Sequence, residues 1–163
     1  MKTFILTIAI ASFSCVTSCT GNQPEAATAN EPIAESTDQP VVTAYIQLKN
    51  ALVLSDVAAA SAAAGSLAEI LAKEGADSNI TEAASGIASG EDVDQQRVHF
   101  KIISDHLIKT INSGSTGQTL FIQYCPMAFD NDGASWISLS EDIRNPYFGD
   151  QMLHCGSVEK IIE

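Results

Sequence analysis

Residues 41–74 read VVTAYIQLKNALVLSDVAAASAAAGSLAEILAKE, and this stretch decides the fold class. Its apolar and small residues recur at steps of three and four, the period of an α-helix, at Tyr45, Leu48, Leu52, Ala59, Ala62, Ala63, Ser66 and Ile70. The alanine-rich centre has high helix propensity and lets another helix approach closely. Lys73 in the last turn and Gly75 just after it are typical of a helix C-terminus. The segment therefore predicts one long helix.

A second apolar stripe predicts a helix over residues 92–112. Aspartates lie in its first turn and Lys109 lies near its end, so its charges agree with the helix dipole. The stripe consists of Phe100, Ile103, Leu107 and Ile111. A weaker pattern over residues 77–90 predicts a short helix between the two long ones. Helices joined in this way form an antiparallel bundle.

The sequence changes character after Gly117. Residues 120–124 and 136–139 are β-rich apolar runs, and Asp130-Asn131-Asp132-Gly133 between them is a typical hairpin turn. Residues 157–162 are compatible with a short helix or a strand. We therefore expect a mainly α fold: an antiparallel helical bundle with an irregular C-terminal cap that contains a short β-hairpin.

The first 18 residues have the features of a lipoprotein signal peptide. Lys2 precedes a short apolar run, and Val16-Thr17-Ser18-Cys19 resembles a lipobox, with cleavage before Cys19 and lipidation of its thiol. An ordinary secretory signal with incidental cysteines is the alternative. Thr20 stands where an aspartate would favour retention in the inner membrane. We therefore expect an outer-membrane lipoprotein that faces the periplasm.

Composition divides the mature chain into two parts. Residues 19–40 are rich in Ala, Glu, Pro, Asn and Thr, which predicts a flexible tether, and residues 41–163 form one domain large enough for its own core. The formal net charge is −12, with no basic cluster. These charges argue against a nucleic-acid partner, since binding to phosphates needs Lys and Arg.

Two segments near the C-terminus each combine a cysteine with a methionine: Cys125-Pro126-Met127 and Met152-Leu153-His154-Cys155. Cleavage removes Cys15 and lipidation uses Cys19, so Cys125 and Cys155 are the two cysteines left in the mature domain. Thiolate and thioether are soft donors that suit Cu(I). We therefore consider Cys125, Met127, Met152 and Cys155 as candidate metal ligands, with His154 and His99 as further candidates.

The spacing of the two cysteines is equally compatible with a disulfide between Cys125 and Cys155, with both methionines packed in the core. The paired methionines favour a metal, because a disulfide alone does not require them. The histidines His99 and His106 are seven residues apart on one helix and need a third element to share an ion. No orienting residue or oxyanion nest accompanies a cysteine–histidine pair, so we expect no enzyme activity and no catalytic residues.

Three stretches carry a resemblance to a known family: QYCPMAF at residues 123–129, GASW at 133–136 and IRNPYFGDQMLHCG at 143–156. Over residues 41–162 the chain resembles the periplasmic family catalogued as domain of unknown function 3347. Its members occur alone as secreted proteins or lipoproteins and also fused to periplasmic adaptor subunits of heavy-metal efflux pumps. The resemblance implies handling of copper or silver, with Cys125, Met127, Met152 and Cys155 as donors and efflux components as partners.

These observations favour a lipid-anchored periplasmic protein that binds Cu(I), or Ag(I), and either buffers the metal or delivers it to efflux. The alternative is a disulfide-stapled interaction module of the cell envelope that binds no metal. Both hypotheses require the two cysteines to meet in space, which the tertiary structure must decide.

Overall fold

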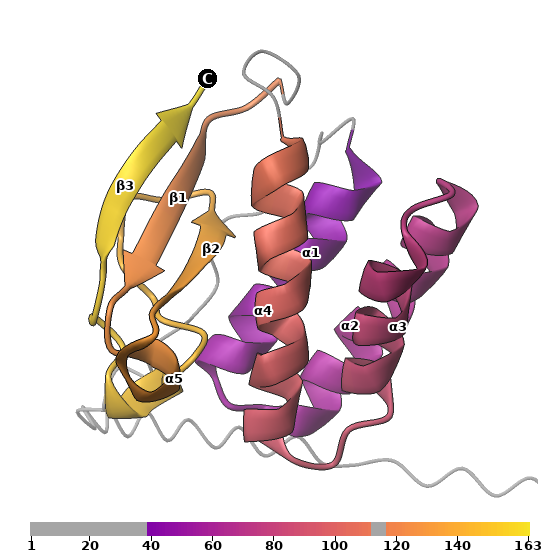
Figure 1. Ribbon diagram of the computed structural model, residues 1–163, viewed down its shortest axis with the longest axis horizontal. Helices are drawn as coiled ribbons and strands as arrows, with labels where there is room; N and C mark the ends of the chain where they lie inside the picture. Colours follow the sequence, from indigo (N-terminus) through magenta and orange to yellow (C-terminus); the bar gives the residue numbers. More distant parts are fainter. Residues whose placement is uncertain (1–38, 112–116) are drawn as a thin grey trace, which may run out of the picture.

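The computed structural model describes residues 39–111 and 117–163, and Figure 1 shows a group of helices beside a small sheet. The expected signal peptide at residues 1–18, the lipidated Cys19 and the tether as far as residue 38 lie outside the described residues. No helix in the described part of the chain combines the length and the apolar character needed to cross a bilayer.

The predicted long helix over residues 41–74 is wrong, because the structure has two helices there: α1 (Pro40–Val53) and α2 (Val57–Lys73). Ser55 adopts the left-handed conformation, with φ 54°, and the Asp56 N–H donates to the Ala51 carbonyl oxygen at 3.0 Å. The Asp56 carboxylate then accepts from the Ala59 N–H at 2.9 Å and caps α2. The C-terminus of α1 and the N-terminus of α2 thus both have hydrogen-bond partners within a three-residue connection, and the chain turns back on itself.

The two later helices confirm the sequence prediction. Helix α3 spans Ser78–Ala88 and α4 spans Val93–Thr110. Each begins after an aspartate whose carboxylate accepts from backbone N–H groups: Asp77 caps α3, and Asp92 caps α4 through two bonds of 3.0 Å. Along the chain each helix packs against the next one, so α1 to α4 form a helical layer with short connections.

The predicted hairpin is confirmed, and a third strand extends it. Strands β1 (Leu120–Cys125), β2 (Ala134–Ser138) and β3 (Ser157–Ile162) form an antiparallel sheet in the order β2-β1-β3. The short helix α5 (Ala128–Asn131) and the 3₁₀ turn η1 (Gly149–Gln151) lie in the connections. The C-terminal cap, residues 120–162, is therefore more regular than the sequence predicts.

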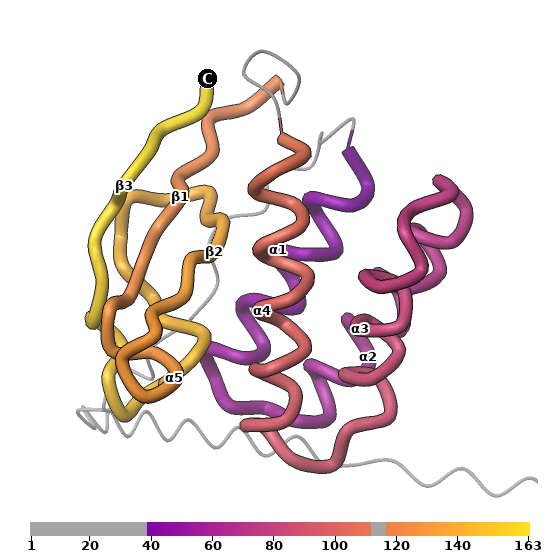
Figure 2. Tube along the Cα trace, viewed as in Figure 1, coloured from indigo at the N-terminus to yellow at the C-terminus, as the bar shows by residue number. Residues whose placement is uncertain are grey.

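Helices and sheet share one hydrophobic core. Tyr45 of α1 stacks on Phe100 of α4, with ring centroids 5.1 Å apart, and its hydroxyl shares a 2.7 Å hydrogen bond with Ser104. The same hydroxyl oxygen accepts from the Ile137 N–H of β2 at 3.1 Å. Figure 2 shows why this bond matters: β2 is the strand nearest to α4, and β3 forms the outer edge of the sheet. The edge of β2 is thus closed by a helix side chain.

Candidate functional site

The two cysteines of the cap meet. Cys125 is the last residue of β1, fully buried and opposite Ala134 of β2, whereas Cys155 is partly exposed in the turn before β3. Their Sγ atoms lie 3.1 Å apart. The antiparallel pairing of β1 with β3 brings together these two residues, which are thirty positions apart in the sequence. We call Cys125 and Cys155 the sulfur pair.

Asn145 anchors the segment that carries Cys155. This residue is fully buried, and its side-chain Nδ2 donates to the Cys155 carbonyl oxygen at 2.8 Å. Its backbone N–H donates to the Leu153 carbonyl oxygen, also at 2.8 Å. Gly156 follows with φ 146°, and a Cβ there would lie 2.8 Å from the Tyr124 carbonyl oxygen. A side chain at this position would push the turn away from β1, so glycine allows the sulfurs to approach.

Cys125 influences the ionisation of the Cys155 thiol. The hydrogen bond with Cys125 raises the pKa of the Cys155 thiol above its ordinary value, and burial and the charge of Cys125 add to the effect. A raised pKa means that Cys155 stays protonated at a pH where a free thiol begins to ionise. A metal ion that binds the pair must therefore displace a proton from Cys155.

Neither methionine of the candidate ligand set is core filler. The Met127 side chain is 48% exposed, and Met152 is partly buried outside the apolar core. Met127 follows Cys125 by two residues, and the Met152 carbonyl oxygen accepts from the Cys155 N–H at 3.0 Å. Each methionine thus belongs to the short segment that positions one cysteine of the pair.

The three histidines lie in different places. His154 is exposed, and its Nδ1 lies 3.0 Å from the Ile143 carbonyl oxygen, so Nδ1 is the donor in the neutral ring and Nε2 carries the lone pair. His99 does not reach the cap: its ring packs against Gly86 of α3, on the side of α4 away from the sheet (Figure 1). His106 is partly buried and lines a hollow at the C-terminal end of α4.

The separation of the sulfur pair lies between two bonded arrangements. A disulfide requires an S–S distance of about 2.05 Å. Two thiolates bound to one tetrahedral ion at about 2.3 Å are roughly 3.8 Å apart. The observed 3.1 Å between the Sγ atoms lies between these two distances. The pair is therefore suited both to oxidation and to the binding of a soft ion.

The donor set around the pair is small. In residues 39–111 and 117–163, no group of three or more His, Cys, Asp or Glu side chains could hold a metal ion. The available donors are the two thiols, the two thioethers on the same segments and Nε2 of His154. Hard cations such as Mg²⁺ and Ca²⁺ prefer oxygen ligands, which this corner of the cap does not supply as a group.

Sequence reasoning missed the role of Asn145 in positioning the segment that carries Cys155. The signal that could have found it is an asparagine in a turn, because such side chains often bond to the backbone two residues further on, as Asn145 does to the Tyr147 N–H. Tyr147, two residues further on, is buried, and its hydroxyl donates to the Ser135 carbonyl oxygen at 2.7 Å. Its ring packs edge-on against the Trp136 ring, with centroids 6.0 Å apart. Burial, the charge of Tyr45 and other neighbours raise the pKa of Tyr147 well above 10.0. Tyr147 therefore stays neutral and supports the cap.

Comparison with known proteins identifies only the helical part of the chain. Residues 41–119 match the family described as "Protein of unknown function (DUF3347)". No curated protein and no solved structure matches the chain. The matched segment covers α1 to α4 except for Pro40 and ends just before β1, so the sulfur pair lies beyond it.

Proposed function

The helical part of this chain, residues 41–119, belongs to a family whose description assigns no activity, and from the geometry of the sulfur pair we propose that the protein binds Cu(I) as a cargo. The observation that carries this proposal is the 3.1 Å contact between two thiols from distant parts of the chain, one of them accessible from outside. The protein buffers the ion in the cell envelope, held by a lipid on Cys19, or delivers it to efflux components.

The chemistry of the donors supports Cu(I), with Ag(I) as its close analogue. Structural Zn²⁺ needs four ligands in a tetrahedron, and a pair of thiols provides half of them. Cu(I) prefers soft thiolate and thioether donors, and both types are present on the two segments of the site. Cys125 and Cys155 act as the anionic ligands, and Met127 and Met152 supply uncharged thioethers whose binding does not depend on pH.

The unequal exposure of the two thiols supports transfer by ligand exchange. Cys125 is fully buried and Cys155 is partly exposed, so an ion arrives at and leaves from Cys155. The exposed Met127 and the free Nε2 of His154 lie on the segments around this entry point. A partner that offers its own soft ligands replaces those of the cap one at a time, and no bond of the protein chain is made or broken.

Replacing both cysteines tests the proposal. We expect the Cys125→Ser/Cys155→Ser variant to lose about 100-fold or more in Cu(I) affinity, because the thiolates supply most of the binding energy. The measurement is competition with a colorimetric Cu(I) chelator under reducing conditions. In the matched variant Met127→Leu/Met152→Leu, both thiolates remain and the loss is about tenfold. A double cysteine variant that competes as well as the parent protein contradicts the proposal.

A second candidate function is a disulfide-stapled interaction module without metal. It is favoured by the direct contact of the two sulfurs, because an oxidising compartment would join them. The bond would close a loop of about thirty residues and stabilise the domain by about 3–4 kcal/mol. Counting free thiols in protein purified without reductant separates the candidates: no thiols and no copper favour the staple, and two thiols or bound copper favour the metal carrier.

A further inference from the structure

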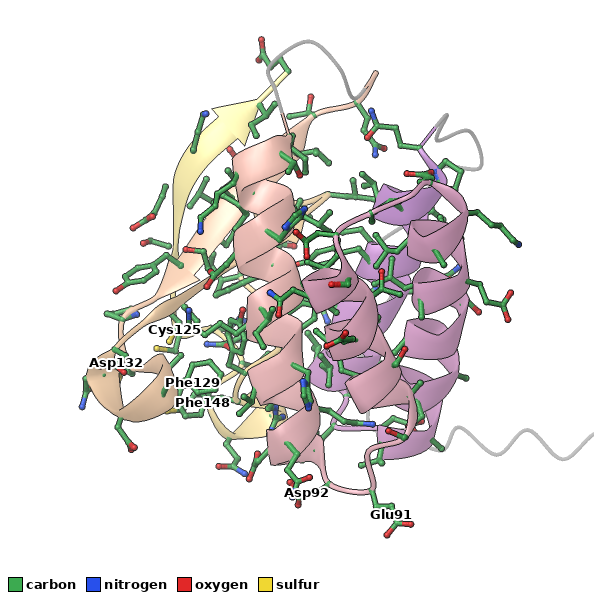
Figure 3. All side chains as sticks on the ribbon, turned by 45° about the vertical axis from the view of Figure 1, so that its right-hand side comes forward. Glu91, Asp92, Cys125, Phe129, Asp132 and Phe148 are labelled. Atoms are coloured by element: carbon green, nitrogen blue, oxygen red, sulfur yellow. The ribbon has the colours of Figure 1, made fainter. Side chains whose placement is uncertain are left out.

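A hollow of about 360 Å³ lies between the N-terminal half of α4 and the cap. Three aromatic residues, Phe129, Tyr147 and Phe148, line it together with Val98 and the buried Arg97 side chain. Two carboxylates form its rim: the Asp94 side chain is 82% exposed, and Asp130 is exposed as well. Figure 3 labels Phe129 and Phe148, which line this hollow together.

The turn that follows Cys125, at residues 128–133, places Phe129 and Asp130 at the hollow. Phe129 and Asp130 both adopt left-handed backbone conformations, with φ 51° and 57°. The turn is closed by the Gly133 N–H, which donates to the Ala128 carbonyl oxygen at 2.9 Å. It directs Phe129 against Tyr147, with ring centroids 5.4 Å apart, and leaves the carboxylate of Asp130 in solvent beside the ring. An aromatic side chain, Phe129, and a carboxylate, Asp130, thus line the same hollow.

Arg97 does not make the hollow a site for anions. Its Nε donates to the Pro146 carbonyl oxygen at 2.9 Å, its Nη2 donates to Ser55 Oγ at 2.9 Å, and its Nη1 pairs with Asp94 at 2.9 Å. The guanidinium is therefore paired with a carboxylate, and each of its three nitrogens already donates a hydrogen bond. Among the described residues no cation pairs with Asp130, so the opening keeps an excess negative charge.

We propose that this hollow binds a lysine or arginine side chain of a protein partner. Such a side chain has an apolar stem, which the aromatic residues can cover, and a cationic end, which the Asp130 carboxylate attracts. The chain carries a net charge of −12, which favours approach by a basic surface. The proposal goes beyond metal binding and holds whether the sulfur pair binds copper or forms a disulfide.

The hollow lies on the turn that follows Cys125, so a partner bound there would lie beside the cap. Phe129 is four residues after Cys125, on the same turn as the exposed Met127. A partner held by its basic side chain would face the segment that carries these sulfur atoms. The hollow would thereby fix the orientation of a docked protein beside the cap.

The experiment titrates the purified protein with acetyl-Gly-Arg-Gly-amide, or its lysine analogue, and follows backbone and ring signals by NMR. We expect saturable, weak binding whose shifts centre on Phe129 and Phe148. In Asp130→Asn the affinity falls about threefold, because one charge is lost while Asn still tolerates the left-handed backbone. In Phe148→Leu it falls by a similar factor, about threefold, and in Phe148→Tyr it is kept, because only Leu removes the aromatic face.

Glu82→Gln is the matched control, because it removes one exposed charge on α3, outside the hollow. It should leave the affinity unchanged. An equal loss in Glu82→Gln and Asp130→Asn would mean that only the net charge attracts the peptide, and the proposal would fall. Equal binding of the glutamine analogue of the peptide, or no saturation with the parent protein, overturns it as well. The fluorescence of Trp136, the single tryptophan, confirms that each variant is folded.

Discussion

Asn145 shows how one buried polar residue positions a reactive group. All four of its hydrogen-bonding groups are used: the backbone N–H, the backbone oxygen, Nδ2 and Oδ1. Their partners are Leu153, Gly149, Cys155 and Tyr147, which are spread over the whole turn before β3. A buried amide with every group satisfied has one orientation, and it transmits that orientation to its partners. Cys155 therefore faces Cys125 partly because Asn145 holds its carbonyl group.

We expect Asn145→Ala to lower the free energy of unfolding by about 2–3 kcal/mol. The substitution leaves the Cys155 carbonyl and the Tyr147 N–H without their side-chain partner in a buried place. Urea denaturation under reducing conditions measures the change. The control is Asn79→Ala, because Asn79 is exposed on α3 and its loss should change stability by no more than about 0.5 kcal/mol. Equal effects of the two variants would show that Asn145 does not hold the turn.

The raised pKa of Cys155 predicts how its reactivity depends on pH. Alkylation requires the thiolate. At a given pH, Cys155 should therefore react more slowly than an isolated thiol that is equally exposed to solvent. In Cys125→Ala the hydrogen bond and the neighbouring charge are lost, so the pKa of Cys155 falls toward its ordinary value. The rate profile of Cys155 alkylation should therefore move to lower pH, as measured by mass spectrometry. Identical profiles in the two proteins would exclude this coupling.

The raised pKa of Cys155 also makes the stability of the reduced protein depend on pH. Because the folded pKa of Cys155 is higher than the unfolded pKa, the protonated thiol stabilises the reduced protein fully at pH values below the unfolded pKa. That contribution is lost as the pH rises through the folded pKa. Reduced protein should thus become less stable in alkaline solution, and Cys155→Ala should show less of this decline.

At the scale of elements, the unusual feature is the left-handed turn within α5. Three consecutive residues other than glycine have positive φ: Phe129, Asp130 and Asn131 at 51°, 57° and 74°. Each costs roughly 1–2 kcal/mol in the general case, and less for Asp and Asn. Such a turn persists only where its surroundings hold it, here through Phe129 against Tyr147 and the backbone bonds to Gly133 and Asp132.

Substitutions at Asn131 separate backbone strain from side-chain contacts, because this side chain is exposed. Asn131→Val should lower the free energy of unfolding by about 1–2 kcal/mol, since a β-branched residue fits φ 74° poorly. Asn131→Gly removes the same side chain but accepts the conformation, so its stability should stay close to that of the parent. Thermal or urea unfolding compares the two. If Val and Gly behave alike, the turn carries no strain at this position.

At the scale of the whole molecule, Arg97 joins the helices to the cap. From α4 it reaches Ser55 in the turn between α1 and α2 and the Pro146 carbonyl in the cap, and it also pairs with Asp94. It is 5% exposed. The bond to Ser55 also explains why the break between the first two helices lies where it does. One guanidinium thus connects three parts of the fold.

We expect Arg97→Met to lower the free energy of unfolding by about 3 kcal/mol or more, because buried acceptors lose a charged donor. Arg97→Lys should not restore stability, since an ammonium lacks the planar fork that reaches three partners. Lys101→Met on the same helix is the control. Lys101 forms a partly exposed pair with Asp105 at 2.7 Å, and its loss should cost less than about 1 kcal/mol. A similar cost for Met at both positions would contradict the role of Arg97.

The outer edge of the sheet also belongs to this scale. Strand β3 lies at the edge of the three-stranded sheet, and its residues are mostly exposed, including Glu159 and Lys160. Charged side chains at an edge discourage pairing with another strand. The cap can therefore keep an accessible site without exposing an edge prone to aggregation.

Local patterns predicted the elements well where one physical rule decided the outcome. The apolar stripe of α4 and its acidic N-terminus are visible in the sequence, and the helix at Val93–Thr110 agrees with them. The Asp-Gly turn between two β-rich runs predicted the β1–β2 hairpin. The long helix failed at Ser55 and Asp56, where a capping aspartate and a partner on α4 outweigh helix propensity.

By itself, the sequence determined the types of elements, the acidic character of the domain and the choice of sulfur donors, because helical period, charge and side-chain chemistry are local properties. Only the tertiary structure decided that Cys125 and Cys155 touch, that Met127 stays exposed and that His99 faces α3. Those facts depend on strand pairing and on bonds between residues far apart in the chain, such as those of Asn145 and Arg97. No local pattern encodes these contacts, because the interactions that stabilise them form only when distant segments of the chain pack together.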